Sequence, residues 1–170
     1  MQVFEAEFAK DRQKFSAAHF TIFEDGSVER LHGHNYRVKV TFTAALGELG
    51  LMFPFHQAKA LIKALCDAWD ERVIVPTACP WLDVDQSQKG QVGLHLKTPR
   101  VEKVYSFPLE DTLLLPINNV SCENLVAVFA EALARRCEED ELNYQSMTVA
   151  IGESDGQDIR MTLQKPAATK

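Results

Sequence analysis

The sequence predicts one α+β domain in which an antiparallel sheet is covered by two helices. Three observations lead to this prediction. Apolar and polar residues alternate over residues 31–42, as in a strand with one buried face. Apolar residues recur at helical spacing near 54–69 and again from 121 to about 138. A last alternating segment covers 147–153, so the element order is ββ-α-β-α-β.

The bulk composition limits the functional class. A chain of 170 residues with 46% hydrophobic and 25% charged residues is typical of one globular domain. A net charge of -6 without a basic stripe argues against nucleic acid as a partner. No apolar run suits a membrane span, and the first residues do not resemble a signal peptide, so we expect a cytoplasmic protein. The four cysteines form no CxxC pair and are expected to be reduced thiols: Cys66, Cys79, Cys122 and Cys137.

The first 46 residues predict a β-hairpin. Residues 15–19 alternate in polarity, and a second strand begins near Leu31. The turn signal Asp25-Gly26 lies between the two strands and would fold them into an antiparallel pair.

The rest of the chain predicts two helices and several strands. Pro54 suits the first turn of the first helix, and Ser121 suits the N-cap of the second. Short β-rich segments at 73–76, 91–96, 101–107 and 112–116 predict strands, with an extra hairpin around 88–108. Residues 165–170 are expected to form a frayed tail.

Three of the five histidines lie within one short stretch of the chain. His32 and His34 are two residues apart, so in a strand both imidazoles project from one face. His19 would lie on the neighbouring strand of the hairpin. Three converging imidazoles are typical of a catalytic zinc site with one open position. The alternative is an ordinary solvent-facing pair of histidines in a strand.

Five sequence blocks resemble the 6-pyruvoyltetrahydropterin synthase and 6-carboxytetrahydropterin synthase family. The first block is FSAAH followed by LHGHNYRVKV. The others are GLMFPF at 50–55, WDER at 69–72, SCENL at 121–125 and IGES at 151–154. The order and spacing of these blocks cover most of the chain.

The resemblance implies a tunnelling fold, in which subunits close their sheets into an oligomeric barrel, a homotrimer or homohexamer. It also implies Zn²⁺ held by His19, His32 and His34, and a pterin, 7,8-dihydroneopterin triphosphate, as the small-molecule substrate. Zinc bound in this way polarises substrate oxygens and acidifies neighbouring protons.

The catalytic residues depart from the family pattern at two places. Val28 stands where pyruvoyl-type members have a catalytic cysteine, and Glu29 follows it. A subgroup with glutamate in place of that cysteine is the most similar, so Glu29 is the expected general base. Asp70 matches the family's catalytic aspartate, but Glu71 replaces the histidine beside it, which weakens the expected proton relay.

Two further glutamates match the family's substrate-binding positions. Glu153 corresponds to the residue that accepts hydrogen bonds from the pterin ring, and Glu123, at the start of the second helix, is expected to assist from a neighbouring subunit. An ordinary N-terminal helix glutamate is the alternative for Glu123.

The resulting functional prediction is a zinc-dependent pterin lyase that cleaves the substrate side chain to 6-hydroxymethyl-7,8-dihydropterin. The alternatives are 6-pyruvoyl- or 6-carboxytetrahydropterin synthase activity, or a non-catalytic protein that binds zinc and pterin.

Overall fold

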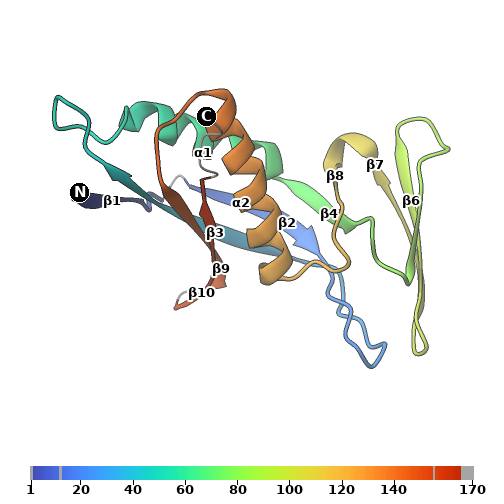
Figure 1. The fold of residues 1–170 in the computed structure, drawn as a ribbon. Coiled ribbons are helices and arrows are strands. Elements are labelled where there is room, and N and C mark those ends of the chain that lie inside the picture. The colour runs from blue at the N-terminus through green and yellow to red at the C-terminus, as the bar shows by residue number, and fades with distance from the viewer. Residues whose placement is uncertain (1, 12, 155, 166–170) are drawn as a thin grey trace.

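The computed structural model describes residues 2–11, 13–154 and 156–165, and its architecture is a large sheet covered by two helices (Figure 1). The predicted α+β class is confirmed. Residues 166–170, where most of the frayed tail is predicted, lie outside the described residues. No described helix combines the length and apolar character needed to cross a membrane.

The predicted hairpin is present as β2 (Lys14–His19) and β3 (His32–Ala45), which pair antiparallel. A simple hairpin for the first 46 residues is nevertheless wrong, because β1 (Val3–Phe8) pairs with the second half of β3. β3 has 14 residues and is long enough to pair with two successive strands on the same edge. Most of β1 is exposed in the single chain, so its alternating pattern is weak.

Both helices pack on the same face of the sheet. α1 (Phe55–Trp69) follows Pro54, and α2 (Cys122–Glu139) begins after Ser121, whose hydroxyl accepts a hydrogen bond from the Asn124 amide at 3.3 Å. The two predicted helix starts are therefore confirmed. The core between the layers combines buried residues of α1, α2 and β3, which are Ala58, Ile62, Leu65, Leu125, Phe129, Leu133, Tyr36, Val38, Val40 and Phe42.

The large sheet is mixed rather than antiparallel, which corrects the prediction. Its remaining strands are β4 (Arg72–Pro76), β8 (Thr112–Leu115), β9 (Ser146–Ser154) and β10 (Gln157–Gln164). Among the described residues, the strand order is β10-β9-β3-β2-β4-β8, with β1 also on β3. β4 runs parallel to β2 and β8 parallel to β4, because helical or long connections return the chain in the same direction.

A smaller sheet contains β5 (Leu82–Asp85), β6 (Gln91–Lys97) and β7 (Glu102–Pro108). A short 3-10 helix, Leu109–Asp111, connects β7 to β8. The expected extra hairpin is β6–β7, seen at the right of Figure 1. Its apolar face packs on the segment after β2 through residues that include Phe20, Ile22 and Leu94. That the hairpin is an insertion relative to smaller family members stays a prediction.

Position 152 in β9 requires glycine, because the backbone at Gln157 lies too close for a side chain. A Cβ at this position would collide with the carbonyl oxygen of Gln157. We expect Gly152→Ala to lower the free energy of unfolding by about 1–3 kcal/mol, as measured by urea denaturation. Gly47→Ala is the matched control, because its Cβ would lie 3.5 Å from the Leu51 carbonyl oxygen, an ordinary van der Waals contact. Equal stability of the two variants would contradict this packing argument.

Candidate metal centre and adjoining cavity

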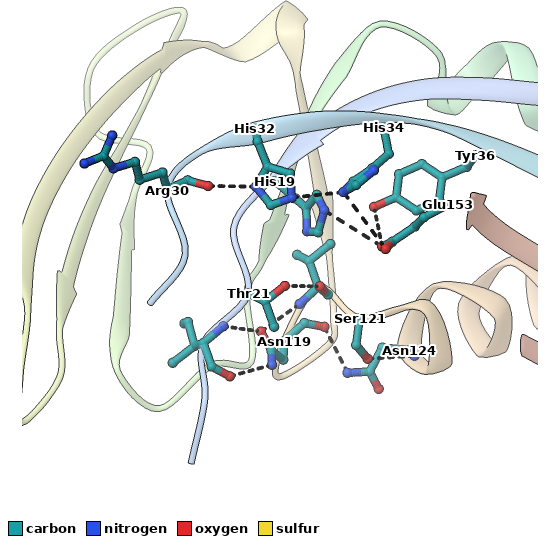
Figure 2. A network of polar contacts seen from close by, with 12 residues as sticks. His19, Thr21, Arg30, His32, His34, Tyr36, Asn119, Ser121, Asn124 and Glu153 are labelled. Atoms are coloured by element: carbon teal, nitrogen blue, oxygen red, sulfur yellow. Dashed lines mark hydrogen bonds and ion pairs between the residues drawn. The ribbon is translucent and has the colours of Figure 1, made fainter. Parts of the chain in front are cut away.

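Three imidazoles converge where β2 ends and β3 begins (Figure 2). His19 lies directly opposite His32 in the antiparallel register, and His34 follows on the same face of β3. The ring centroids are 4.7 Å apart for His19 and His32, 5.3 Å for His19 and His34, and 4.8 Å for His32 and His34. One nitrogen from each ring lies within 4.8 Å of the other two, so the group can hold a metal ion.

The surroundings of His19 and His32 suit metal binding. His19 is 2% exposed, and neither of its ring nitrogens has a hydrogen-bond partner. Burial, and then the neighbouring His32, lower the pKa of His19, which favours the neutral ligand form. The carbonyl oxygen of Arg30 lies 2.7 Å from Nδ1 of His32. A proton on Nδ1 directs the lone pair of Nε2 into the cluster, as metal-binding histidines require.

A carboxylate lies beside the imidazoles. Oε1 of Glu153 is 4.0 Å from Nε2 of His19, and Oε2 is 4.0 Å from Nε2 of His34. The Tyr36 hydroxyl donates to Oε1 at 3.3 Å. The register between β3 and β9 determines this position. Arg37 pairs with Gly152, so the adjacent Tyr36 and Glu153 lie close enough to share a hydrogen bond. Figure 2 shows the carboxylate directed at the rings from the β9 side.

The sequence interpretation missed Tyr36. Burial, followed by the Glu153 charge, raises the pKa of this phenol, so Tyr36 remains a hydrogen-bond donor. A signal was present in the sequence, because Tyr36 continues the two-residue spacing of His32 and His34 on one strand face.

Three further segments, the loop after β2, the start of α2 and the end of β9, meet at a cavity of about 570 Å³. It is lined by Glu29 from the loop after β2, Glu123 from the start of α2 and Glu153 from β9. Cys122 also lines the cavity, next to the Glu153 carboxylate. Burial, and then the Glu153 charge, raise the pKa of Cys122 to about 12, so the thiol is neutral. No sequence motif distinguished this cysteine from the other three.

The loop that carries Glu29 is held at both ends. The Asn119 side chain accepts from the Ile22 amide at 3.1 Å and donates to the Ile22 carbonyl at 2.8 Å. Nζ of Lys103, in β7, donates to the Glu29 carbonyl at 3.2 Å. The Glu29 carboxylate is near enough for its charge to act on His19, where it favours the protonated ring. Glu29 therefore borders the cavity, and its charge reaches His19 of the candidate metal centre.

Asp70 and Glu71 lie outside the cavity of Glu29 and Glu153 in the single chain. Oδ1 of Asp70 accepts a hydrogen bond from the Ser16 amide at 2.6 Å, which ties the end of α1 to β2. Glu71 has a positive φ of 56° and lines a second hollow of about 490 Å³, which His34 of the candidate metal centre also lines. Neither carboxylate lines the cavity of Glu29 and Glu153. Their catalytic role stays a prediction.

Comparison with known proteins gives consistent matches. A family model described as 6-pyruvoyl tetrahydropterin synthase matches residues 9–162. A Methanocaldococcus jannaschii protein, named as a proposed 6-carboxy-5,6,7,8-tetrahydropterin synthase, is 31% identical over 146 residues, which cover 85% of this chain and 86% of that protein.

Solved structures show the same fold. The 6-pyruvoyl tetrahydropterin synthase of Plasmodium vivax has a TM-score of 0.87 at 24% identity and covers 97% of this chain and 100% of its own. A variant structure of that protein, with a TM-score of 0.88, 24% identity and the same coverage, has alanine in place of a glutamate described as a catalytic residue.

Proposed function

Since the chain belongs to the 6-pyruvoyl tetrahydropterin synthase family, we propose that it is a zinc-dependent tetrahydropterin synthase acting on 7,8-dihydroneopterin triphosphate. One observation carries this proposal. The three imidazoles lie together, and Glu153, whose oxygens are 4.0 Å from two of them, lines a cavity with glutamates from two other segments. A metal ion can polarise the side-chain oxygens of a hydroxylated pterin, and carboxylates can accept hydrogen bonds from its ring.

The comparisons correct the predicted product. The relatives and structures that match this chain are named 6-carboxy- or 6-pyruvoyl-tetrahydropterin synthases, and they favour the alternative activity over cleavage to 6-hydroxymethyl-7,8-dihydropterin. Glu29 in place of a cysteine had suggested the cleavage. A catalytic glutamate is also described for the Plasmodium vivax synthase, so a carboxylate alone does not indicate a different product. We propose 6-carboxy-5,6,7,8-tetrahydropterin, the product in the names of the curated relatives.

His19, His32 and His34 would hold Zn²⁺, and the buried, unpartnered ring nitrogens of His19 fit that ion. When bound, zinc supplies Lewis acidity that makes protons near the substrate side-chain oxygens easier to remove. The Glu29 carboxylate, at the border of the cavity, then accepts such a proton as general base.

The pterin ring is the proposed ligand of the other two glutamates. A pterin presents its 2-amino group and N3–H side by side, and one carboxylate can accept both hydrogen bonds. Glu153 has this function in our proposal, and Glu123 borders the same cavity. Helix α2 begins at Cys122, so its N-terminal dipole also stabilises the Glu123 carboxylate, and the two roles are compatible.

Assembly is the remaining part of the proposal. The expected homotrimer or homohexamer would place surfaces of neighbouring chains beside one another. Asp70 and Glu71, which the single chain separates from the cavity, would then contribute only to the site of a neighbouring subunit.

Product analysis tests the proposed function. Purified protein with zinc is incubated with 7,8-dihydroneopterin triphosphate, and the pterins are separated by chromatography. We expect 6-carboxy-5,6,7,8-tetrahydropterin as the main product. A main product of 6-pyruvoyltetrahydropterin would assign the other synthase activity. Formation of 6-hydroxymethyl-7,8-dihydropterin, or no conversion, would contradict the proposal.

A further inference from the structure

We propose that the Glu153 carboxylate is the fourth ligand of the metal in the substrate-free protein, and that a bound pterin withdraws it. This inference rests on the zinc site proposed above. It gives Glu153 a second role, in which the residue closes the open coordination position until substrate arrives.

The distances bring the carboxylate close to ligand geometry. Zinc bonds of ~2.0–2.2 Å in a tetrahedral site place ligand atoms ~3.3–3.5 Å from one another. The two oxygens of Glu153 are each 4.0 Å from the Nε2 atom of a different histidine, His19 and His34. Each oxygen is therefore only about 0.5–0.7 Å farther from its neighbouring imidazole nitrogen than a fourth ligand would be.

A hydrogen bond holds the carboxylate on this side of the cavity. The Tyr36 hydroxyl donates to Oε1 at 3.3 Å, and Cys122 lines the same cavity. Carboxylates that ligate metals are commonly held by such outer hydrogen bonds. The backbone of Glu153 is fixed as well, because β9 is paired with β3 next to Gly152.

The charge around the cavity favours the same arrangement. Glu29, Glu123, Glu153 and Asp158 line one cavity, and no lysine or arginine is found among its described lining residues. Lys39 pairs with Asp158 at 2.6 Å. Like charges that share a cavity repel one another unless a cation offsets them. A divalent cation on the three histidines is the counter-charge that Glu153 can reach, since its oxygens already face His19 and His34.

The two roles of Glu153 exclude one another. A pterin that donates from its 2-amino group and N3–H occupies both carboxylate oxygens. A ring that donates to both oxygens must lie in front of the carboxylate, between its oxygens and the metal, so binding of the ring opens the fourth position for a substrate side-chain oxygen. In the closed state Glu153 ligates the metal, and in the open state it does not. The pterin shifts the site to the open state because it binds that state more tightly.

Azide binding to cobalt-substituted protein tests this inference without any turnover measurement. Co²⁺ in place of zinc has visible absorption bands that change when a small anion becomes a ligand. We expect azide to bind Glu153→Ala at least about tenfold more tightly than the wild-type protein, because the position is then open. Glu153→Gln, which keeps the shape but loses the charge, should also bind azide more tightly.

Glu123→Ala is the matched control, because it removes one negative charge from the same cavity without removing the proposed ligand. It should bind azide as the wild-type protein does. Zinc affinity, measured by chelator competition, should fall at least about tenfold in Glu153→Ala and stay unchanged in Glu123→Ala.

Equal azide and zinc affinities for wild-type protein, Glu153→Ala and Glu153→Gln would overturn the proposed ligand role. So would an equal gain in azide affinity in Glu123→Ala, which would indicate a charge effect alone. Failure of the underlying zinc site is distinguishable, because the wild-type protein would then bind no Co²⁺ or Zn²⁺ at all.

Discussion

The double variant His32→Ala, His34→Ala is expected to fold, to contain no zinc and to have no measurable turnover. Two of the three imidazoles in the cluster are then missing, and His19 alone cannot form a tetrahedral zinc site. Both residues are partly exposed, so their removal leaves little unfilled core volume. The measurement is metal content by mass spectrometry, with about one zinc per wild-type chain and almost none in the variant.

His95→Ala is the matched control for this experiment. His95 lies in the small sheet, is exposed and contacts Glu102 at 2.8 Å. This variant should retain zinc and turnover. Full zinc occupancy in the double histidine variant would place the metal elsewhere and remove the basis of the proposed function.

The second large effect concerns the general base. Glu29→Ala should lower turnover by roughly 10²–10⁴-fold, the usual range for loss of a positioned base, while zinc remains bound. The carboxylate borders the cavity, and its charge reaches His19, yet it is not part of the histidine cluster. Steady-state turnover and metal content, measured on the same preparation, separate the two roles.

Glu24 provides the control, since it is an exposed acid in the same loop and does not line the cavity. Glu24→Ala should keep wild-type turnover. If Glu29→Ala keeps it as well, another group removes the proton. Loss of zinc from Glu29→Ala would instead indicate a structural or ligand role for this carboxylate.

Local sequence patterns were sufficient for the elements around the metal centre. The alternation of β3 and the turn at Asp25-Gly26 correctly predicted that β2 and β3 pair, which places His19 opposite His32. The N-cap at Ser121 correctly predicted the start of α2 beside the cavity. These features depend on neighbours close in the sequence, where periodicity and capping preferences operate directly.

Features that depend on long-range pairing were not predictable. β1 and β10 have weak burial patterns in the single chain, and only their pairing with β3 and β9 makes them strands. The parallel position of β4 beside β2 depends on how the chain returns after α1. The approach of Glu153 to His19 and His34 likewise follows from the β3–β9 register, which no local motif encodes.

Turnover as a function of zinc content tests the central proposal most directly. Zinc is removed by chelation, and the protein is incubated with 7,8-dihydroneopterin triphosphate while zinc is added back in steps. We predict no product without zinc, then a linear rise in the formation of 6-carboxy-5,6,7,8-tetrahydropterin that stops at about one zinc per chain. An equal rate of product formation by the metal-free protein would contradict the account.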